Sequence, residues 1–251
     1  MKNGSVHRIW YDEPEIWARE QESRVERECA FLERVFKRHG VRTVLDVGCG
    51  AGSHCGYLHG RGYSMTGVDL NKTLIRHAKR TYPDIDFSVA DQTQLSFTSR
   101  FDAIITLCTV IAYATTNEDL VTTLQNHNRA LKRRGILIID TFNPIVFIDK
   151  AVHLREQKKS ANESGYASTR QYSVDENNQL SIDEATFTDR NGRIVSHDRS
   201  VKRMTFPQEM RYFLEQSGFD VLGFYGDFDL RRTTLDGHRM IVIAQKATNP
   251  R

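Results

Sequence analysis

The hydrophobic positions of the first 142 residues follow two alternating patterns. Short, nearly continuous apolar runs, typical of strands buried on both faces, lie at 43–47, 64–68, 85–89, 101–107 and 136–141. Segments in which apolar residues recur at helical spacing lie at 14–39, 53–59, 71–81 and 118–131. A helix between successive strands indicates βαβ units, and therefore an α/β fold with a parallel sheet covered by helices on both faces.

The pattern changes after Pro144. Runs in which polar and apolar positions alternate, separated by turn-forming residues, lie at 166–174, 180–187 and 194–204. We expect an antiparallel meander with one face in solvent, inserted after the fifth strand. Pro207 then begins a predicted helix that ends near Gln216. Two further strands are expected at 221–228 and 239–245.

We interpret residues 1–251 as a single domain, because no internal repeat or low-complexity linker divides the chain. Four parts are expected within it: an N-terminal helical lid, a core of alternating strands and helices, a β-rich insertion, and a C-terminal helix with two strands. In the same order they cover residues 1–40, 41–143, 144–205 and 206–251.

Composition and charge narrow the function classes. The net charge is only +3, and basic residues are interspersed with acids, as between Arg24 and Glu28, which predicts a solvated face and disfavours nucleic-acid binding. No apolar run approaches the roughly 20 residues of a membrane helix, and the N-terminus lacks a signal peptide, so we expect a cytoplasmic protein without a membrane partner. The four cysteines form no C-x-x-C pair, so no metal site is expected.

A glycine-rich loop follows the first predicted strand. Asp46 is followed by Gly48, Gly50 and Gly52. Glycines let the backbone turn sharply and approach a ligand, and the next helix offers free N–H groups at its N-terminus. Open α/β sheets bind nucleotides at this position. NAD is the competing ligand, but its fingerprint has the spacing G-x-G-x-x-G, whereas this loop has G-x-G-x-G.

Acidic side chains end the next two predicted strands. Asp69 ends the second strand, where a carboxylate can accept hydrogen bonds from both hydroxyls of a ribose. Asp91 ends the third strand, where a carboxylate can meet an adenine amino group. The alternative roles are a turn or helix cap for Asp46 and a loop start for Asp91. We interpret Asp102 as a residue that braces the sheet.

Four runs in register resemble the successive motifs of class I S-adenosylmethionine (SAM)-dependent methyltransferases. They lie within about residues 40–142 and read VLDVGCGAGSHCGYL, GVDLN, ADQTQL and FDAIITLCTVIAY. The resemblance implies SAM as the cofactor and a Rossmann-like, mostly parallel sheet of seven strands. It implies the strand order 3-2-1-4-5-7-6 with strand 7 antiparallel, in which the last two predicted strands take positions 6 and 7.

The resemblance also implies roles for the glycine loop. Gly48, Gly50 and Gly52 would line the methionine and ribose of SAM. Asp46 would support this loop and the methionine amino group, directly or through water.

The other strand ends would hold the rest of the cofactor. Asp69 would bind the ribose hydroxyls, and Leu70 would pack on the adenine ring. Asp91 would bind the adenine amino group, and the backbone N–H of Gln92 would reach the ring. The carbonyl of Leu107 would face the methionine ammonium.

The β-rich insertion resembles that of small-molecule N-methyltransferases that dimethylate amino sugars. In that group the N-terminal segment covers the cofactor, and Tyr11 together with Ile16 and Trp17 resembles this lid. Tyr11 would touch the methionine carboxylate or the sulfonium; its alternative role is packing on the first helix. The insertion would serve as a lid or as the interface of a homodimer.

The residues after the fourth and fifth strands would form the acceptor pocket. Tyr113 is the candidate catalytic residue, and Asn143 would bind substrate or form a turn. His153, His197 and His238 are candidate general bases, with a surface position as the alternative for each.

We predict an enzyme that transfers a methyl group from SAM to a small-molecule acceptor, preferably an amine nitrogen, by in-line displacement. The alternatives are an O-methyltransferase, a tRNA or protein methyltransferase, and a non-catalytic SAM-binding protein. Arg231, Arg232 and Arg239 would clamp an anionic group of the acceptor, or form a solvated basic face.

Overall fold

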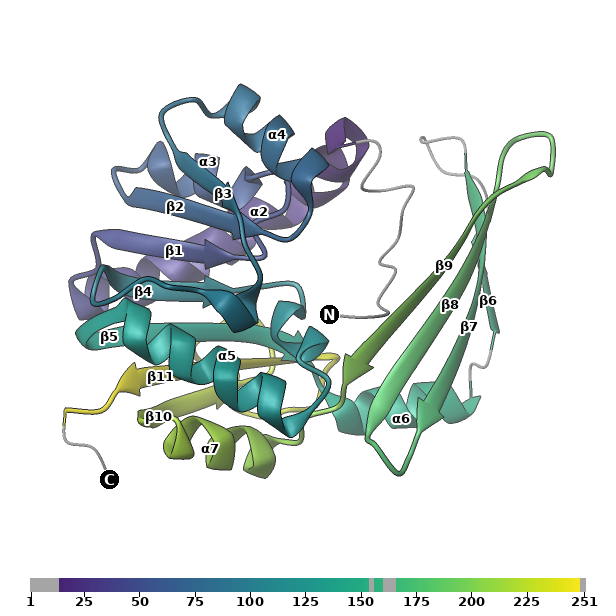
Figure 1. Ribbon diagram of the computed structural model, residues 1–251. Coiled ribbons are helices and arrows are strands. Elements are labelled where there is room, and N and C mark those ends of the chain that lie inside the picture. Colours follow the sequence, from purple (N-terminus) through teal and green to yellow (C-terminus); the bar gives the residue numbers. More distant parts are fainter. Residues whose placement is uncertain (1–13, 154–155, 160–165, 249–251) are drawn as a thin grey trace.

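The computed structural model describes residues 14–153, 156–159 and 166–248. Within them the chain forms a seven-stranded sheet covered by helices and a separate four-stranded sheet, and the two sheets lie side by side (Figure 1). No helix in these ranges is long and apolar enough to cross a membrane.

The seven-stranded sheet has the predicted order. Its strands are β1 (Thr43–Val47), β2 (Ser64–Asp69), β3 (Asp86–Val89), β4 (Phe101–Thr106), β5 (Leu131–Phe142), β10 (Phe219–Tyr225) and β11 (Arg239–Lys246). They run β10-β11-β5-β4-β1-β2-β3, and β11 is antiparallel to both of its neighbours. The expected order 3-2-1-4-5-7-6 and the antiparallel seventh strand are therefore confirmed.

Two layers of helices cover this sheet. The helices are α2 (Pro14–His39), α3 (Ser53–His59) and α4 (Lys72–Thr81) on one face, and α5 (Asn117–Ala130) and α7 (Pro207–Gln216) on the other. Neighbouring residues of β1 pack into opposite layers, because Val44 lies in the first core cluster and Leu45 in the second. Burial on both faces explains why the strands are nearly continuous apolar runs.

The insertion contains more structure than the alternating runs predict. It consists of α6 (Pro144–His153), β6 (Glu156–Lys159), β7 (Ala167–Asp175), β8 (Leu180–Thr188) and β9 (Ile194–Arg203). The strands form an antiparallel sheet in the order β6-β7-β8-β9, which confirms the expected meander and adds an edge strand. Helix α6 and strand β6 are absent from the sequence prediction. So are two short 3₁₀ helices, η1 (Gln92–Gln94) and η2 (Val110–Tyr113).

Candidate functional site

The glycine loop turns sharply at the end of β1. Gly48, Gly50 and Gly52 all adopt positive φ angles, of 79°, 55° and 85°. The N–H of Gly48 donates to the carbonyl of Val68 at 2.7 Å, which ties the loop to β2. A Cβ added at Gly48 would lie 2.3 Å from Val110 Cγ2. The backbone conformation therefore favours glycine at all three positions, and at Gly48 the packing of Val110 also leaves no space for a side chain.

Asp69 lies against this loop. Its Oδ2 accepts from the N–H of Gly50 at 2.9 Å, and its Oδ1 accepts from the N–H of Asn71 at 2.7 Å. Burial raises the pKa of Asp69, although the hydrogen bonds from Asn71, Gly50 and Leu70 oppose this rise. The carboxylate is thus held in place by backbone donors at the mouth of the loop.

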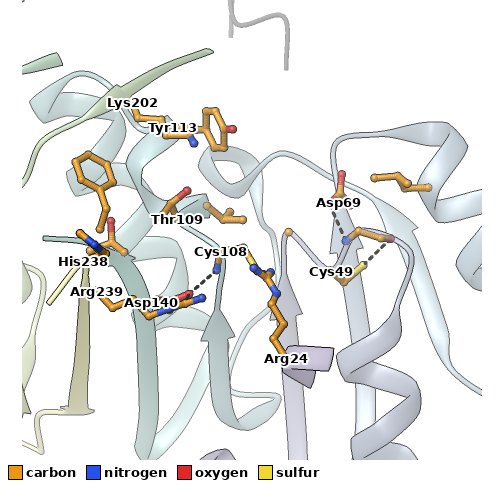
Figure 2. A pocket seen from close by; sticks show the side chains of 16 residues that line it. Arg24, Cys49, Asp69, Cys108, Thr109, Tyr113, Asp140, Lys202, His238 and Arg239 are labelled. Atoms are coloured by element: carbon orange, nitrogen blue, oxygen red, sulfur yellow. Dashed lines mark hydrogen bonds and ion pairs between the residues drawn. The ribbon is translucent and has the colours of Figure 1, made fainter. Parts of the chain in front are cut away.

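One cavity of about 450 Å³ joins the glycine loop to the insertion. Figure 2 shows Asp69 and Cys49 on one side of it and Tyr113, Lys202 and His238 on the other. A cavity of this size is typical of sites for small molecules and cofactors. The lining brings together residues of α2, the seven-stranded sheet and β9.

A buried carboxylate pairs with two arginines of the cavity wall, Arg24 and Arg239. Glu28 of α2 is 0% exposed. Its carboxylate lies 2.8 Å from His54 Nε2, 3.4 Å from Arg239 Nη2 and 3.7 Å from Arg24 Nε. Arg239 also pairs with Asp140 at 2.7 Å. The solvated face predicted between Arg24 and Glu28 is therefore wrong for Glu28, because its carboxylate is buried and pairs with Arg239 of β11 as well as with Arg24 of its own helix.

The pKa of Glu28 reflects these partners. Burial by itself raises the pKa, but the hydrogen bond from His54 and the charges of Arg24 and Arg239 outweigh it. The net pKa lies below the ordinary value of 4.5, so the carboxylate is ionised at neutral pH.

Opposite charges border the cavity between α2 and β5. Cys108 donates its N–H to Asp140 Oδ2 at 2.9 Å, and its Sγ contacts the guanidinium of Arg24. Within the described residues, Asp140 Oδ1 and Arg24 Nε have no hydrogen-bond partner. Arg24 has a free donor and Asp140 a free acceptor at the same cavity. Such a pair can bind the carboxylate and the ammonium of a zwitterionic amino-acid group.

Cys108 and Thr109 hold a strained turn after β4. Their φ angles are 56° and 65°, in the left-handed region that residues other than glycine seldom adopt. Thr109 donates its N–H to the carbonyl of Asp140 at 3.0 Å, which fixes the turn against β5. Such strain is concentrated at functional sites, and here it places both residues on the cavity wall.

Asp46 is buried behind the glycine loop and is absent from the cavity lining. Cys55 Sγ donates to its Oδ2 at 3.5 Å. Burial raises the pKa of Asp46 to about 6, partly opposed by the charge of His54. Asp46 is therefore a buried anion whose ionisation at neutral pH costs free energy of folding.

This raised pKa gives a testable pH dependence. Because native Asp46 binds a proton more readily than the unfolded chain does, its contribution to stability should increase as the pH falls through its pKa of about 6. The free energy of unfolding of the wild type, relative to Asp46→Asn, should rise by about 1 kcal/mol between about pH 7 and pH 5. Urea titrations of both proteins at each pH measure this difference. Identical pH profiles would contradict the assignment.

The cavity includes part of the predicted cofactor set. Its lining contains Gly48, Gly50 and Asp69, together with the predicted catalytic residue Tyr113. The predicted residues outside this lining are Asp46, Gly52, Leu70, Asp91, Gln92 and Leu107.

The structure gives these residues the following surroundings outside the lining. Leu70 is 54% exposed at the end of β2. Asp91 caps η1 by accepting from the N–H of Thr93 at 2.9 Å. The Gln92 side chain donates to the carbonyl of Val110 at 3.3 Å, and the Leu107 carbonyl accepts from the N–H of Val110 at 3.2 Å.

The remaining candidates are placed as follows. Tyr11 lies outside the described residues, as do the side chains of Ile16, Trp17 and His153. His238 lines the cavity. His197 lies elsewhere, on the four-stranded sheet, where its Nδ1 is 3.0 Å from Thr186 Oγ1.

Two predicted polar groups have structural partners. Asn143 is buried and donates to the carbonyls of Leu235 and Gly237 at 2.9 and 3.1 Å, so its side chain closes a turn. Asp102 accepts from the N–H of Thr43 at 2.8 Å, which confirms that it braces the sheet.

The predicted arginine cluster does not act as a unit. Arg231 and Arg232 lie outside the cavity lining, in ion pairs with Asp229 and Asp236, each at 2.9 Å. Of the three arginines, Arg239 alone reaches the cavity, and it is bound to the buried carboxylates described above.

Comparisons with known proteins agree with this geometry. A family profile described as "Methyltransferase domain" matches residues 44–135, from β1 into β5. A relative from Geobacillus sp. (strain WCH70), provisionally named a methyltransferase, is 26% identical over 231 residues, covering 86% of this chain and 91% of the relative.

Two further similar proteins are named for amino sugars. The dTDP-4-amino-2,3,4,6-tetradeoxy-D-glucose N,N-dimethyltransferase of Saccharopolyspora spinosa is 29% identical over 110 residues, covering 43% of this chain and 44% of that protein. The crystal structure of the sugar N-methyltransferase KedS8 from Streptoalloteichus sp. superposes with a TM-score of 0.73 at 22% identity, covering 98% of this chain and 95% of that one. The structural likeness extends over the insertion as well as the core.

Proposed function

We propose, from the premise that this chain is a class I SAM-dependent methyltransferase, that it methylates an amine nitrogen of a small molecule. The observation that carries the proposal is the continuous cavity of about 450 Å³ described above. It joins the glycine loop, where this class of enzyme holds SAM, to a wall of aromatic and titratable side chains beside the insertion.

The residues at the cofactor end fit SAM. Asp69 accepts hydrogen bonds from the ribose hydroxyls, and Gly48 and Gly50, which line the cavity without side chains, let the ligand approach the backbone. Arg24 pairs with the methionine carboxylate, and the unpartnered Oδ1 of Asp140 accepts from the ammonium. The Leu107 carbonyl remains a proposed second acceptor for that ammonium.

The adenine end is assigned to the tips of β2 and β3. The exposed Leu70 side chain packs on the adenine ring, because both surfaces are then removed from water. Asp91 and the backbone of Gln92 contact the edge of the ring. Asp46 and Gly52 act from behind, by supporting the loop that Gly48 and Gly50 form.

The acceptor end orients the nucleophile. When bound, SAM supplies a methyl group on a sulfonium that is already activated for displacement. Tyr113 and His238 border the remaining space, so the tyrosine hydroxyl holds the acceptor and the imidazole takes the proton that an ammonium must lose. Fixed alignment recovers about 7–11 kcal/mol of the barrier in favourable cases.

The insertion favours a small amine over a macromolecule. It stands beside the acceptor end of the cavity, where Tyr113 Oη lies 3.5 Å from Ser200 Oγ of β9. The amino-sugar N-methyltransferases named above support nitrogen as the acceptor atom. We assign the insertion a lid role, and dimerisation through it stays a prediction.

The test is methyl transfer from isotopically labelled SAM to a panel of amines and matched alcohols, followed by mass spectrometry. Methylated amines are expected, with little product from the alcohols. Tyr113→Phe should lower kcat/KM for the acceptor about tenfold, because one hydrogen bond is lost, and should leave SAM affinity unchanged. Methylation of bulk tRNA alone, or of no acceptor, would contradict the proposal.

A further inference from the structure

Strand β9 contributes a cation to the acceptor end of the cavity. The Lys202 ammonium lies 5.5 Å from the centroid of the Tyr113 ring, and both residues line the cavity (Figure 2). Ser200, two residues earlier on the same face of β9, contacts the Tyr113 hydroxyl. This face of the insertion is therefore turned toward the methyl-transfer site.

Lys202 differs from the other cations of the lining. Arg24 and Arg239 each have a buried carboxylate within 4 Å. Within the described part of the chain, no carboxylate lies within ion-pair distance of Lys202. Asp183, on the neighbouring strand β8, pairs with Arg170 at 2.7 Å, and the charge of Lys202 acts on the Asp183 carboxylate without contact, opposing the rise that burial causes in its pKa. The Lys202 ammonium therefore has an acidic neighbour but no contacting carboxylate, and it can pair directly with a ligand.

The position of this charge restricts the acceptor. A cation beside a partly enclosed cavity attracts an anion more strongly than it would in bulk water, and it repels an ammonium group. An acceptor amine would therefore point away from Lys202, toward the cofactor end. An acceptor that also carries an anionic group would place that group at Lys202.

We propose that Lys202 recognises a carboxylate or phosphate on the acceptor, so that the substrates are amines bearing an anionic group. This deepens the proposed function and rests on it. The sequence suggested that arginines near β11 bind an anionic group of the acceptor. Arg231 and Arg232 instead pair with acidic residues of their own loop, so we assign this role to Lys202 of the insertion.

Matched probes test this proposal by calorimetry on the wild type saturated with S-adenosylhomocysteine. The pairs are O-phosphoethanolamine against ethanolamine, and phenylalanine against phenethylamine. In at least one pair the anionic member should bind about tenfold more tightly, as expected for one charge-assisted hydrogen bond. Lys202→Met should abolish this preference and Lys202→Arg should restore it. Arg199→Met, on the opposite face of β9, serves as the matched control.

Each outcome decides the proposal. A preference in only one pair identifies phosphate or carboxylate as the preferred group. Absence of any preference in the wild type, or its persistence in Lys202→Met, overturns the proposal. Lys202-dependent binding without methylated product would retain the recognition site and refute the proposed reaction. Methylated product that is unaffected by Lys202→Met would support the proposed reaction and refute the recognition site.

Discussion

Asp69→Ala is expected to weaken SAM binding by about two orders of magnitude, because two hydrogen bonds to a charged acceptor are lost. Asp69 lines the cavity, and its carboxylate also fixes the glycine loop by accepting from the N–H groups of Gly50 and Asn71. Isothermal titration calorimetry with SAM measures the change. Asp69→Asn, which keeps one oxygen as an acceptor, should fall between the wild type and the alanine variant.

A matched control separates this effect from loss of charge in general. Asp84 is exposed in the turn before β3, away from the cavity lining, and Asp84→Ala should bind SAM as the wild type does. Far-UV circular dichroism verifies that each variant is folded. A folded Asp69→Ala protein with wild-type affinity would remove Asp69 from the site.

Glu28→Gln is expected to lower the free energy of unfolding by about 3 kcal/mol at neutral pH, because it removes the buried carboxylate that Arg24 and Arg239 share with the His54 ring. These three partners, on α2, β11 and α3, lie within 4 Å of Glu28. The same change should weaken SAM binding, since Arg24 and Arg239 line the cavity. Urea unfolding and calorimetry give the two quantities. Glu26→Gln, exposed on the same helix, is the matched control.

The pH dependence of this loss has a defined sign. Because the pKa of Glu28 lies below its ordinary value of 4.5, its stabilisation is complete above that value and disappears as the pH falls through the lower native pKa. The difference between wild type and Glu28→Gln should therefore shrink in acid, opposite to the trend expected for Asp46. A difference that is small at neutral pH would show that the ion pairs contribute little.

The sequence was sufficient for the seven-stranded sheet because its signals are local. Each strand is a short apolar run, and the resemblance of four motifs supplied the order that periodicity alone does not give. The glycine loop and Asp69 follow from the same motifs, since they occupy the ends of adjacent parallel strands. Helix α6 and strand β6 were missed for local reasons too. Pro144 reads as a turn, and β6 (EQKK) is a short, charged edge strand without alternation.

The charged base of the cavity could not be predicted in this way. Glu28, Asp140 and Arg239 are far apart in the chain and meet only when α2 packs beside the ends of β5 and β11. Read singly, Glu28 belongs to a mixed charged stretch and Asp140 to the end of a strand. The sequence does not single out Lys202. The alternation along β9 shows which residues share a face with Lys202, but it does not show that this face turns toward Tyr113.

No strand of the four-stranded sheet pairs with a strand of the seven-stranded sheet in the described part of the chain. Most of the groups proposed to hold SAM therefore lie at the strand ends of the seven-stranded sheet, with Arg24 on α2 beside it, whereas Lys202 lies on the other sheet (Figure 1). Substitutions across β7, β8 and β9 can change which acceptors are admitted while leaving the cofactor contacts intact. Exchange of this sheet between relatives would then transfer substrate preference without rebuilding the catalytic half.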